Sequence, residues 1–579
     1  MNDRPGNDRF GARLRARLAA RSSARALGIV SASGAVDWWS STQLLEHADA
    51  AARGFAARGI APGDVGVLVA VDPRMAALGV LGLLFAGGVP LLVAPPSIQG
   101  VHSSLRATLL DVAQRTDARV VVVPPAEDVA GELRRTCPHA WVEQDTEALF
   151  RGTAIAAAPP SRRANAFEAA EPRLLQLTSG TTGAPRIVVW REAQIELALD
   201  RMALGMGLDD DDVFVNWTPL YHDMGLVNNL LLCLWRGLPL ALLSPLDVVR
   251  RPGRWLKAMH TTGATTTWSP NFGYALAAER VRDKDLEGLD LSRVRGFWNA
   301  AERVHPDTLR RFHERFAGCG VRRESLRTNF GCVETIGGVT FTPGASTVRI
   351  EHVPWETLPP ATRDVAGEAA QPRGSDVVSC GAPYPELELL ILDDDDRPLP
   401  DGRIGRVAFR GGACFEEYLG EPEATQAARA RGMARTGDLG YRRNGELFWT
   451  GRLSERINLQ GRKLDPSELE RPLLAIPELR KGSFAAFGRA NPVRGTEELV
   501  VLCEIAEESE AYDEQKFEAL ATTVRREVSM ALGVTVEELA LLAKGSLTKT
   551  SSGKRRHLHF RQLYEAGNLE VAHRSRSGL

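Results

Sequence analysis

The segment from Leu174 to Val189 constrains the fold most strongly, because it places a polar loop between two short apolar runs. Residues 178–183 carry four hydroxyl side chains and two glycines in six consecutive positions. Apolar runs of this length on both sides of such a loop are typical of two buried strands. Glycine lets backbone N–H groups approach a ligand closely, and Ser and Thr hydroxyls can donate to phosphate oxygens. The loop is therefore interpreted as a polyphosphate cradle, with an ordinary Ser/Thr/Gly turn as an equally weighted alternative.

Two neighbouring features refine this interpretation. Arg186 follows the loop and would add a cation with several N–H donors. No Gly-Lys-Ser/Thr follows at the spacing of a Walker-type P-loop, so that kind of phosphate site is excluded.

The composition is that of an ordinary globular protein and excludes several classes. The chain has 579 residues, 44% apolar and 25% charged, which is enough for several domains with complete cores. A net charge of −2 gives no basic surface for nucleic acid. The seven cysteines are scattered without a Cys-x-x-Cys pair, which indicates neither a disulfide framework nor a zinc site. A reducing cytoplasm is the compartment that fits best.

The first third of the chain alternates between helical and strand-like segments. Residues 41–59 are expected to form a helix capped by Ser41 or Thr42. Residues 65–71 and 120–123 are expected to form buried strands. Such alternation predicts a mostly parallel sheet covered by helices on both faces.

The run 75–98 carries no charge and is long enough to suggest a membrane span. Gly87, Gly88 and Pro90 divide it into a helix-length piece and a strand-length piece, which predicts a buried α/β segment and no span. Residues 154–171, rich in Ala, Pro and Arg, are expected to be a surface connection that leads into the polar loop.

The second half of the chain is richer in strands and then changes character. Residues 387–392 and 407–410 are expected to be strands. Farther on, shorter elements begin with a strand at 457–459 and a helix that Ser467 and Glu470 would open as a capping box.

These patterns predict an α/β protein of two domains. The large N-terminal domain, residues 36–452, would combine mostly parallel sheets covered by helices with a β-rich subdomain. A small mobile α+β domain, residues 453–567, would follow it. An N-terminal extension, residues 1–35, and a flexible tail, residues 568–579, are expected at the two ends.

The polar loop resembles a known signature. Residues 178–186 resemble the Thr-Ser-Gly-Ser/Thr-Thr-Gly-x-Pro-Lys motif of the adenylate-forming superfamily (acyl-CoA synthetases, adenylation domains and luciferases), with Arg186 in place of Lys. Pro-Leu-Tyr-His-Asp-Met-Gly-Leu at 219–226 resembles the fatty acyl-AMP ligases, a branch that activates carboxylic acids for acyl carrier proteins. His222, more often a core residue on chemistry alone, is catalytic under this resemblance. The resemblance spans about residues 36–565.

The resemblance implies a nucleotide site built from several separated motifs. Asn-Ala-Ala-Glu at 299–302 resembles the branch's Asn-Gly-Ala-Glu, and Asn-Phe-Gly-Cys-Val-Glu at 329–334 resembles the superfamily's Tyr-Gly-x-x-Glu. Phenylalanine can stack on adenine as tyrosine does, because stacking needs only the π face. A carboxylate is a suitable Mg²⁺ ligand. The implied nucleotide and metal residues are Thr178, Ser179, Gly180, Thr181, Thr182, Gly183 and Arg186 at the phosphates, Ala301, Glu302, Asn329 and Phe330 at adenine, and Glu334 with Thr181 at Mg²⁺.

Two later motifs complete the implied site. Arg-Thr-Gly-Asp at 435–438 and Thr-Gly-Arg at 450–452 match the superfamily's ribose-binding pair, so that Asp438 and Arg452 would hold the ribose. Residues 547–556 resemble the Pro-Lys-Thr-x-x-Gly-Lys-x-x-Arg loop, whose catalytic Lys corresponds to Lys554. The family's domain hinge falls at Ser454, where Asp or Lys is usual.

The reaction implied is ATP- and Mg²⁺-dependent formation of an acyl adenylate from a carboxylic acid. Transfer to the phosphopantetheine thiol of an acyl carrier protein would follow, as in polyketide, lipid or nonribosomal peptide biosynthesis. Two alternatives stay open: an acyl-CoA synthetase that uses free CoA, and a non-catalytic relative that only binds ligand. The Pro-, Gly- and charge-rich stretch 341–379 is expected to be a surface loop, in a region where fatty acyl-AMP ligases carry an extra segment.

The sequence leaves the identity of the acid open. Five side chains suggest an apolar acid pocket, although residues of these types are equally common in a core: Trp217, Tyr221, Met224, Trp268 and Phe272.

Overall fold

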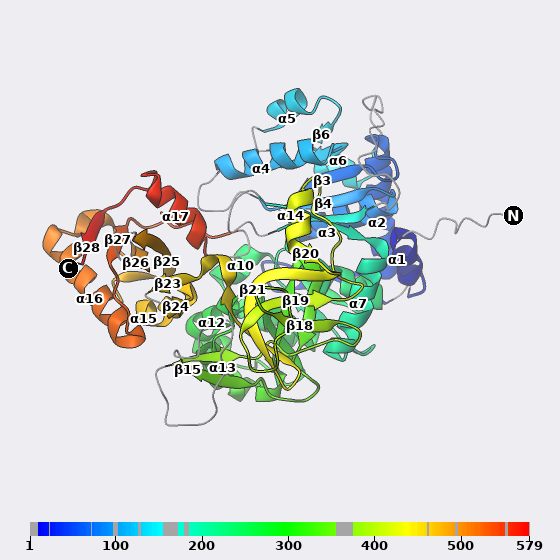
Figure 1. The fold of residues 1–579 in the computed structure, drawn as a ribbon. Helices are drawn as coiled ribbons and strands as arrows, with labels where there is room; N and C mark the ends of the chain where they lie inside the picture. The colour runs from blue at the N-terminus through cyan, green and yellow to red at the C-terminus, as the bar shows by residue number, and fades with distance from the viewer. Residues whose placement is uncertain are drawn as a thin grey trace.

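The computed structural model describes residues 10–21, 24–70, 72–95, 102–125, 129–153, 172–178, 185–354, 374–459, 462–491, 496–550 and 554–577. A large body formed by the first three quarters of the chain carries a smaller C-terminal domain on one side (Figure 1). The expected surface connection at 154–171 and most of the polar loop, Ser179–Ala184, lie outside the described residues.

The larger of two main sheets has nine strands in the order β17-β14-β13-β12-β11-β9-β10-β1-β2. From β13 to β1 the neighbouring strands are parallel, which confirms the mostly parallel sheet predicted from the alternation of elements. The strands are β1 (Arg25–Val30), β2 (Val36–Ser40), β9 (Phe214–Asn216), β10 (Leu240–Leu242), β11 (Thr266–Pro270), β12 (Gly296–Ala300), β13 (Leu326–Cys332), β14 (Gly337–Phe341) and β17 (Ala382–Pro383).

The second main sheet has six strands in the order β6-β5-β3-β4-β7-β8. Its members are β3 (Val65–Val69), β4 (Val89–Val93), β5 (Val120–Val122), β6 (Trp141–Glu143), β7 (Pro172–Leu177) and β8 (Ile187–Arg191). The two strands predicted around the polar loop are β7 and β8, which pair antiparallel while the rest of the sheet is parallel. The loop therefore connects adjacent strands of one sheet.

Helices alternate with the strands of these two sheets along much of the chain. The uncharged run 75–98 contains the helix α3 (Pro73–Phe85) and the strand β4, as predicted. Among the described residues, no helix is both long and apolar enough to cross a membrane. The other main helices of this domain are α2 (Ser41–Ala57), α4 (His102–Arg115), α5 (Ala130–Thr136), α6 (Thr146–Phe150), α7 (Glu192–Met206), α9 (Leu232–Arg236), α10 (Pro245–Arg250), α11 (Gly253–Thr262), α12 (Asn271–Arg280), α13 (Pro306–Phe316) and α14 (Pro422–Ala428).

The cap of α2 differs from the prediction by one residue. Ser40, and neither Ser41 nor Thr42, accepts a hydrogen bond from the Gln43 backbone N–H, and the Gln43 side chain accepts one from the Ser40 N–H. This reciprocal pair is a capping box with Gln at its third helical position.

The N-terminal extension expected for residues 1–35 is part of the large domain from Phe10 onward. The helix α1 (Phe10–Ala19) buries Phe10 completely and stacks its ring on Trp235 at 5.5 Å. The next element, β1, pairs in parallel with β10 in the nine-stranded sheet. The domain boundary at residue 35 stays a prediction, but the sequence could not reveal that β1 pairs with β10.

The β-rich subdomain is an antiparallel sheet of β18 (Glu388–Leu392), β19 (Gly405–Arg410), β20 (Arg429–Ala430), β21 (Met433–Arg443) and β22 (Glu446–Arg452). The surface loop expected at 341–379 is in part a hairpin, because Ile350–Pro354 (β15) pairs with Gly374–Val378 (β16). Residues 355–373 of that stretch lie outside the described residues.

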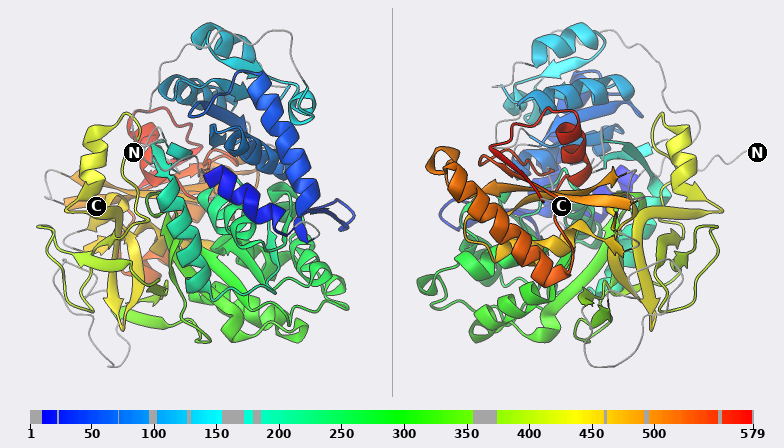
Figure 2. Two further views of the ribbon diagram at one scale, coloured as in Figure 1. Left: turned by 90° about the vertical axis from the view of Figure 1, so that its right-hand side faces the viewer. Right: turned by 60° about the vertical axis from the view of Figure 1, so that its left-hand side comes forward.

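The C-terminal domain has its own core. Its buried apolar residues from Ile457 onward pack among themselves around the sheet β25-β26-β27-β28, and α16 lies across this sheet (Figure 2). Its elements are β23 (Ile457–Leu459), β24 (Arg462–Leu464), α15 (Glu470–Leu474), β25 (Leu479–Asn491), β26 (Thr496–Ile505), α16 (Glu514–Leu532), β27 (Glu538–Leu542), α17 (His557–Glu565) and β28 (His573–Arg576).

Two expectations for this domain are corrected. The capping box is formed by Asp465 and Glu468 at the start of a 3₁₀ turn that precedes α15, and not by Ser467 and Glu470. The tail expected to be flexible contains β28, which pairs with β27 and completes the sheet.

Candidate active site

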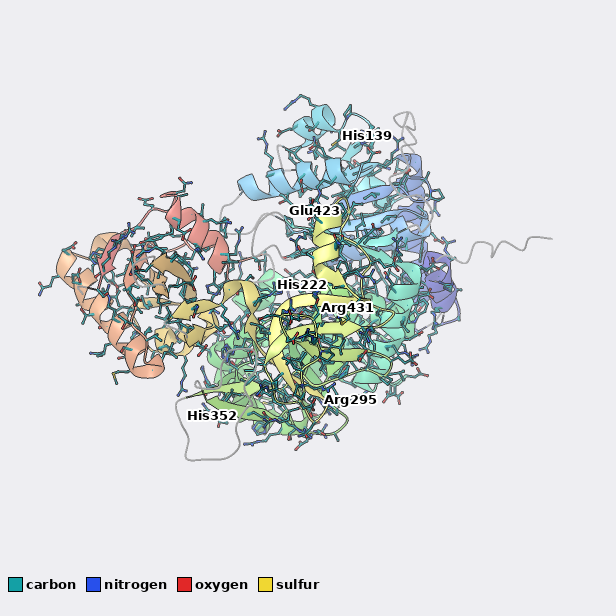
Figure 3. The ribbon with its side chains drawn as sticks, viewed as in Figure 1. His139, His222, Arg295, His352, Glu423 and Arg431 are labelled. Carbon is teal, nitrogen blue, oxygen red and sulfur yellow. The ribbon has the colours of Figure 1, made fainter. Side chains whose placement is uncertain are left out.

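A cleft of about 1120 Å³ lies where both main sheets, the β-rich subdomain and the C-terminal domain meet. Residues from motifs far apart in the sequence line it together, and Figure 3 shows His222 on the side of the large domain that faces the C-terminal domain. Eight of the predicted site residues line this cleft: Thr178, Arg186, His222, Ala301, Asn329, Glu334, Arg452 and Lys554. Ser179, Gly180, Thr181, Thr182 and Gly183 lie outside the described residues.

Lys554 reaches the cleft from the C-terminal domain. Its loop is closed by two hydrogen bonds, from the Lys554 N–H to Thr550 Oγ1 at 3.0 Å and from the Thr550 N–H to the Lys554 carbonyl at 2.9 Å. Burial and the nearby Arg452 guanidinium lower the pKa of Lys554, whereas Asp223 and Asp438 oppose the change. The ammonium group is thus surrounded by charged groups of the large domain.

The large domain presents an acid and an imidazole to this lysine. His222 Nδ1 lies 2.8 Å from Asp223 Oδ1, at the start of the short helix α8 (Asp223–Gly225). Burial raises the pKa of Asp223. The charge and hydrogen bond of His222, with a smaller contribution from Lys554, lower it by more than burial raises it, so the pKa lies below its ordinary value. Asp223 is therefore an ionised, buried partner for the positive charge of Lys554.

The end of the cleft near β7 and β8 is organised around Glu334. The Tyr418 hydroxyl donates a 2.7 Å hydrogen bond to Glu334 Oε1, and the Arg186 guanidinium lies 5.1 Å above the Tyr418 ring. Glu421 forms ion pairs with two arginines: its Oε2 lies 3.3 Å from Arg186 Nε, and its Oε1 lies 2.6 Å from Arg115 Nη2. Tyr418, Glu421 and Arg115 were missed by the sequence analysis, because they belong to no recognised motif and meet the site only through the fold.

Glu334 suits a hard divalent cation. The Tyr418 contact involves only Oε1, and the side chain lines the cleft beside Arg186. A carboxylate oriented by an outer hydrogen bond is the ligand type that Mg²⁺ takes together with phosphate oxygens. The second predicted ligand, Thr181, lies outside the described residues.

Asp438 and Arg452 face one another on the paired strands β21 and β22. Arg452 Nε lies 3.3 Å from Asp438 Oδ1, and Trp449 Nε1 donates to the same oxygen at 3.0 Å. Asp438 raises the pKa of Arg452. Among the residues that the structure describes, both contacts use Oδ1, which leaves Oδ2 of Asp438 for another donor, although the side chain is only 4% exposed.

Of the four residues predicted at adenine, two line the cleft and two do not. Ala301, at φ +69°, and Asn329 line the cleft. Phe330 is not among the residues that line the cleft, and its ring stacks on Phe409 with 5.7 Å between the ring centroids. Glu302 accepts a hydrogen bond from the Phe272 N–H at 2.6 Å, and its pKa is raised by burial. Glu302 is therefore held at the start of α12 and does not line the cleft.

Of the five side chains predicted to form an apolar acid pocket, two line the cleft and three do not. Tyr221 and Met224 line the cleft. Trp217 and Trp268 are core residues, with 2% and 0% of their surface exposed, and Phe272 packs edge-on against Trp217 at 5.7 Å.

The fold and the cleft define an adenylate-forming enzyme, and comparison with known proteins agrees. The sequence model of the AMP-binding enzyme family matches residues 14–419, and the chain belongs to this family. It is an acyl adenylate-forming ligase of the fatty acyl-AMP/CoA ligase type.

Particular relatives and structures give the range of similarity. The chain is 31% identical over 412 residues to the protein named fatty-acid–CoA ligase FadD25 of Mycobacterium tuberculosis, covering 67% of this chain and 69% of that protein. It is 30% identical over 498 residues to the 4-hydroxyphenylalkanoate adenylyltransferase of the same organism, covering 82% and 78%. A structure from a study of fatty acyl-adenylate ligases from E. coli and L. pneumophila superimposes with a TM-score of 0.86 at 26% identity, covering 96% and 98%.

Proposed function

We propose that this protein activates a carboxylic acid with Mg·ATP and passes the acyl group to the phosphopantetheine thiol of a carrier protein. A carboxylate oxygen attacks the α-phosphorus, the bond from that phosphorus to the bridging oxygen breaks, and pyrophosphate leaves. The thiol then attacks the acyl carbon, its proton is lost, and AMP leaves with the former carboxylate oxygen. The product is a thioester.

The observation that carries the proposal is that Lys554, Asp223 and Arg452 line one cleft, with the Asp438 carboxylate close enough to act on the pKa of Lys554. The Lys554 ammonium would neutralise the negative charge of the attacking carboxylate and the α-phosphate. Catalysis of this kind needs positioning and charge compensation and little covalent chemistry from the protein.

The remaining roles follow from position. Thr178 and Arg186 would bind the pyrophosphate portion, beside the loop 179–183, and Asp438 Oδ2 with Arg452 would bind the ribose hydroxyls. Ala301 and Asn329, which both line the cleft, would form the adenine wall. His222, whose Nδ1 lies 2.8 Å from Asp223 Oδ1, would hold the ionised Asp223 in position near Lys554.

Magnesium, when bound, would neutralise part of the phosphate charge. Glu334 would hold it, with Thr181 as the second protein ligand, and Tyr418 would orient the carboxylate through its 2.7 Å hydrogen bond.

We favour a carrier protein over free CoA as the acceptor because residues 219–226 resemble the fatty acyl-AMP ligases, although the relative FadD25 is named a fatty-acid–CoA ligase. The structure with the TM-score of 0.86 comes from a study of fatty acyl-adenylate ligases. The competing function is an acyl-CoA synthetase, which has the same first half-reaction.

Two assays test the proposal in sequence. Carboxylate-dependent exchange of labelled pyrophosphate into ATP reports the first half-reaction, and its absence with every acid would overturn the enzymatic assignment. Incubation of the adenylate-forming enzyme with phosphopantetheinylated carrier protein or with CoA then identifies the acceptor. Thioester formation on the carrier protein and not on CoA is expected, and the reverse result would favour the CoA ligase.

A further inference from the structure

A short segment beside β8 borders the end of the cleft to which the proposed function assigns the pyrophosphate. The Leu419 N–H donates to the Ile187 carbonyl of β8 at 2.8 Å. Two residues farther on, the Glu421 N–H donates to the Tyr418 carbonyl at 3.1 Å, where the chain turns into α14. Because Arg186 is the residue directly before β8, this pairing fixes the Glu421 backbone next to it.

The Glu421 side chain is shared between two arginines. Its contact with Arg186 is the longer one, at 3.3 Å, and the Arg186 side chain is 50% exposed, so water and salt can screen this ion pair. The contact with Arg115 is 2.6 Å long. Arg115 is itself well fixed, because it donates to the Pro185 and Leu419 carbonyls at 3.2 Å and 3.3 Å. Glu421 is therefore held firmly at one carboxylate oxygen and loosely at the other.

The helix that follows does not depend on this carboxylate. Within the described part of the chain, the Glu421 side chain accepts no hydrogen bond from the first N–H groups of α14. The Glu421 carbonyl makes the local contact, since it accepts a hydrogen bond from the Thr425 N–H at 2.9 Å. The carboxylate can thus leave Arg186 without unwinding α14. Its contact with Arg115 would remain, so that its charge would not be left unpaired.

The charges at this end of the cleft cancel one another. Among the described residues that line it, the two guanidinium groups of Arg115 and Arg186 are matched by the two carboxylates of Glu334 and Glu421. A phosphate forms charge-assisted hydrogen bonds with a guanidinium, and these are stronger than a partly exposed ion pair. A pyrophosphate group would therefore take Arg186 from Glu421, and part of its binding would be offset by the loss of that ion pair.

We propose that Glu421 competes with the pyrophosphate group for the Arg186 guanidinium and so sets how tightly the enzyme holds pyrophosphate. When the phosphates bind, the Glu421 carboxylate withdraws onto Arg115, and its return to Arg186 assists the release of pyrophosphate. Glu421 is a positioning residue, because it acts through Arg186 and does not touch the reacting atoms. This proposal rests on the proposed function, which assigns Arg186 to the pyrophosphate portion of ATP.

The first test measures the affinity for pyrophosphate directly. Isothermal titration calorimetry of the full chain with Mg·pyrophosphate requires no knowledge of the acid. Glu421→Gln keeps the shape of the side chain and removes its charge. We expect the Kd for pyrophosphate to fall by about two- to fivefold, which corresponds to the loss of one partly exposed competing ion pair.

Glu416→Gln is the matched control. Glu416 lies on the same segment and pairs with another arginine, Arg191, at 2.7 Å, but this ion pair is outside the cleft. The Kd for pyrophosphate in Glu416→Gln should therefore equal that of the unaltered protein.

Pyrophosphate exchange into ATP gives the kinetic counterpart. In Glu421→Gln the KM for pyrophosphate should fall by the same factor as the Kd, while the KM for the acid stays unchanged. A general disturbance of the fold would not separate the two constants in this way.

A double variant tests whether Glu421 acts through Arg186. Arg186→Gln should raise the Kd for pyrophosphate, and adding Glu421→Gln should then change it little, because the effects of two residues that act on each other are not additive. If Glu421→Gln lowered the Kd equally in both backgrounds, Glu421 would act only by repelling the phosphates, and the proposed competition would be wrong.

The outcomes separate this inference from the function on which it rests. An unchanged or higher Kd for pyrophosphate in Glu421→Gln would overturn the inference and leave the ligase function intact. Tighter pyrophosphate binding in that variant, together with no exchange with any acid, would overturn the ligase function and leave the competition for Arg186 intact.

Discussion

Tyr418 holds Glu334 through a 2.7 Å hydrogen bond between positions separated by 84 residues of sequence. Removing an outer partner of a metal-binding carboxylate typically weakens metal binding by about 10- to 100-fold. We therefore expect Tyr418→Phe to raise the Mg²⁺ concentration for half-maximal pyrophosphate exchange by about tenfold, with the KM for the acid unchanged. Tyr441→Phe is the control, since Tyr441 donates to Glu351 at 2.9 Å outside the cleft. If the two variants showed the same Mg²⁺ dependence, Tyr418 would have no role in orienting the metal-binding carboxylate.

Lys554 should control both the rate and the alkaline limit of adenylation. Lys554→Ala should lower the rate of exchange by about 10²- to 10³-fold, the usual effect of removing a group that stabilises transition-state charge. The large domain should keep its thermal transition, because its core does not include this loop. Near-normal exchange by Lys554→Ala would refute the assigned role.

The direction of the Lys554 pKa gives a pH prediction. Burial and Arg452 lower this pKa below the ordinary lysine value, so the reactive ammonium form is lost at a lower pH than in free lysine. Exchange should therefore fall on the alkaline side before pH reaches that ordinary value. In Lys554→Arg, whatever activity remains should lack this decline, because guanidinium does not titrate in the range. A decline that persists unchanged in the Arg variant would assign it to another group.

A contact between the domains should position the catalytic loop. Glu470 of the small domain lies 3.0 Å from His305 Nε2 of the large domain and 3.2 Å from Nη1 of Arg555, the residue after Lys554. Burial raises the pKa of Glu470, but Arg555 and His305 together lower it by more than burial raises it. The carboxylate therefore stays ionised at neutral pH. Glu470→Gln should slow adenylation, with little change in the KM for ATP.

The exposed pair Lys481–Glu279, at 2.9 Å, also joins the two domains and gives the control. Lys481→Ala should leave the rate of exchange near normal, because exposed ion pairs contribute little. A rate loss in Lys481→Ala equal to that in Glu470→Gln would indicate a general weakening of the domain contact and not a specific role of Glu470.

Phe10 tests whether the N-terminal helix belongs to the large domain. Its ring is fully buried and stacked on Trp235, so Phe10→Ala should destabilise the large domain by about 3–5 kcal/mol, the usual cost of emptying an aromatic core site. Differential scanning calorimetry should show a lower transition for that domain, with the transition of the small domain unmoved. Leu204→Ala, at a site 59% exposed, should change neither. An unchanged large-domain transition in Phe10→Ala would restore the view of a separate extension.

Much of this protein follows from local pattern. The strands on both sides of the polar loop, the division of the run 75–98 into α3 and β4, and the small domain with its own core were all predicted, because each depends on the spacing of apolar residues along a short segment. The motifs singled out Lys554, Glu334 and Arg452, and the fold places all three on the walls of one cleft. Their roles there stay predictions.

The tertiary structure decided which distant segments of the chain contact one another. The sequence alone indicated the class of reaction, through the resemblance of its separated motifs to those of the adenylate-forming superfamily. Only the fold brought Tyr418 to Glu334, Asp223 to the vicinity of Lys554, and Glu421 to Arg115 and Arg186. These contacts depend on strand order, register and side-chain volume, which arise from the packing of the whole chain and leave no signal in any one segment.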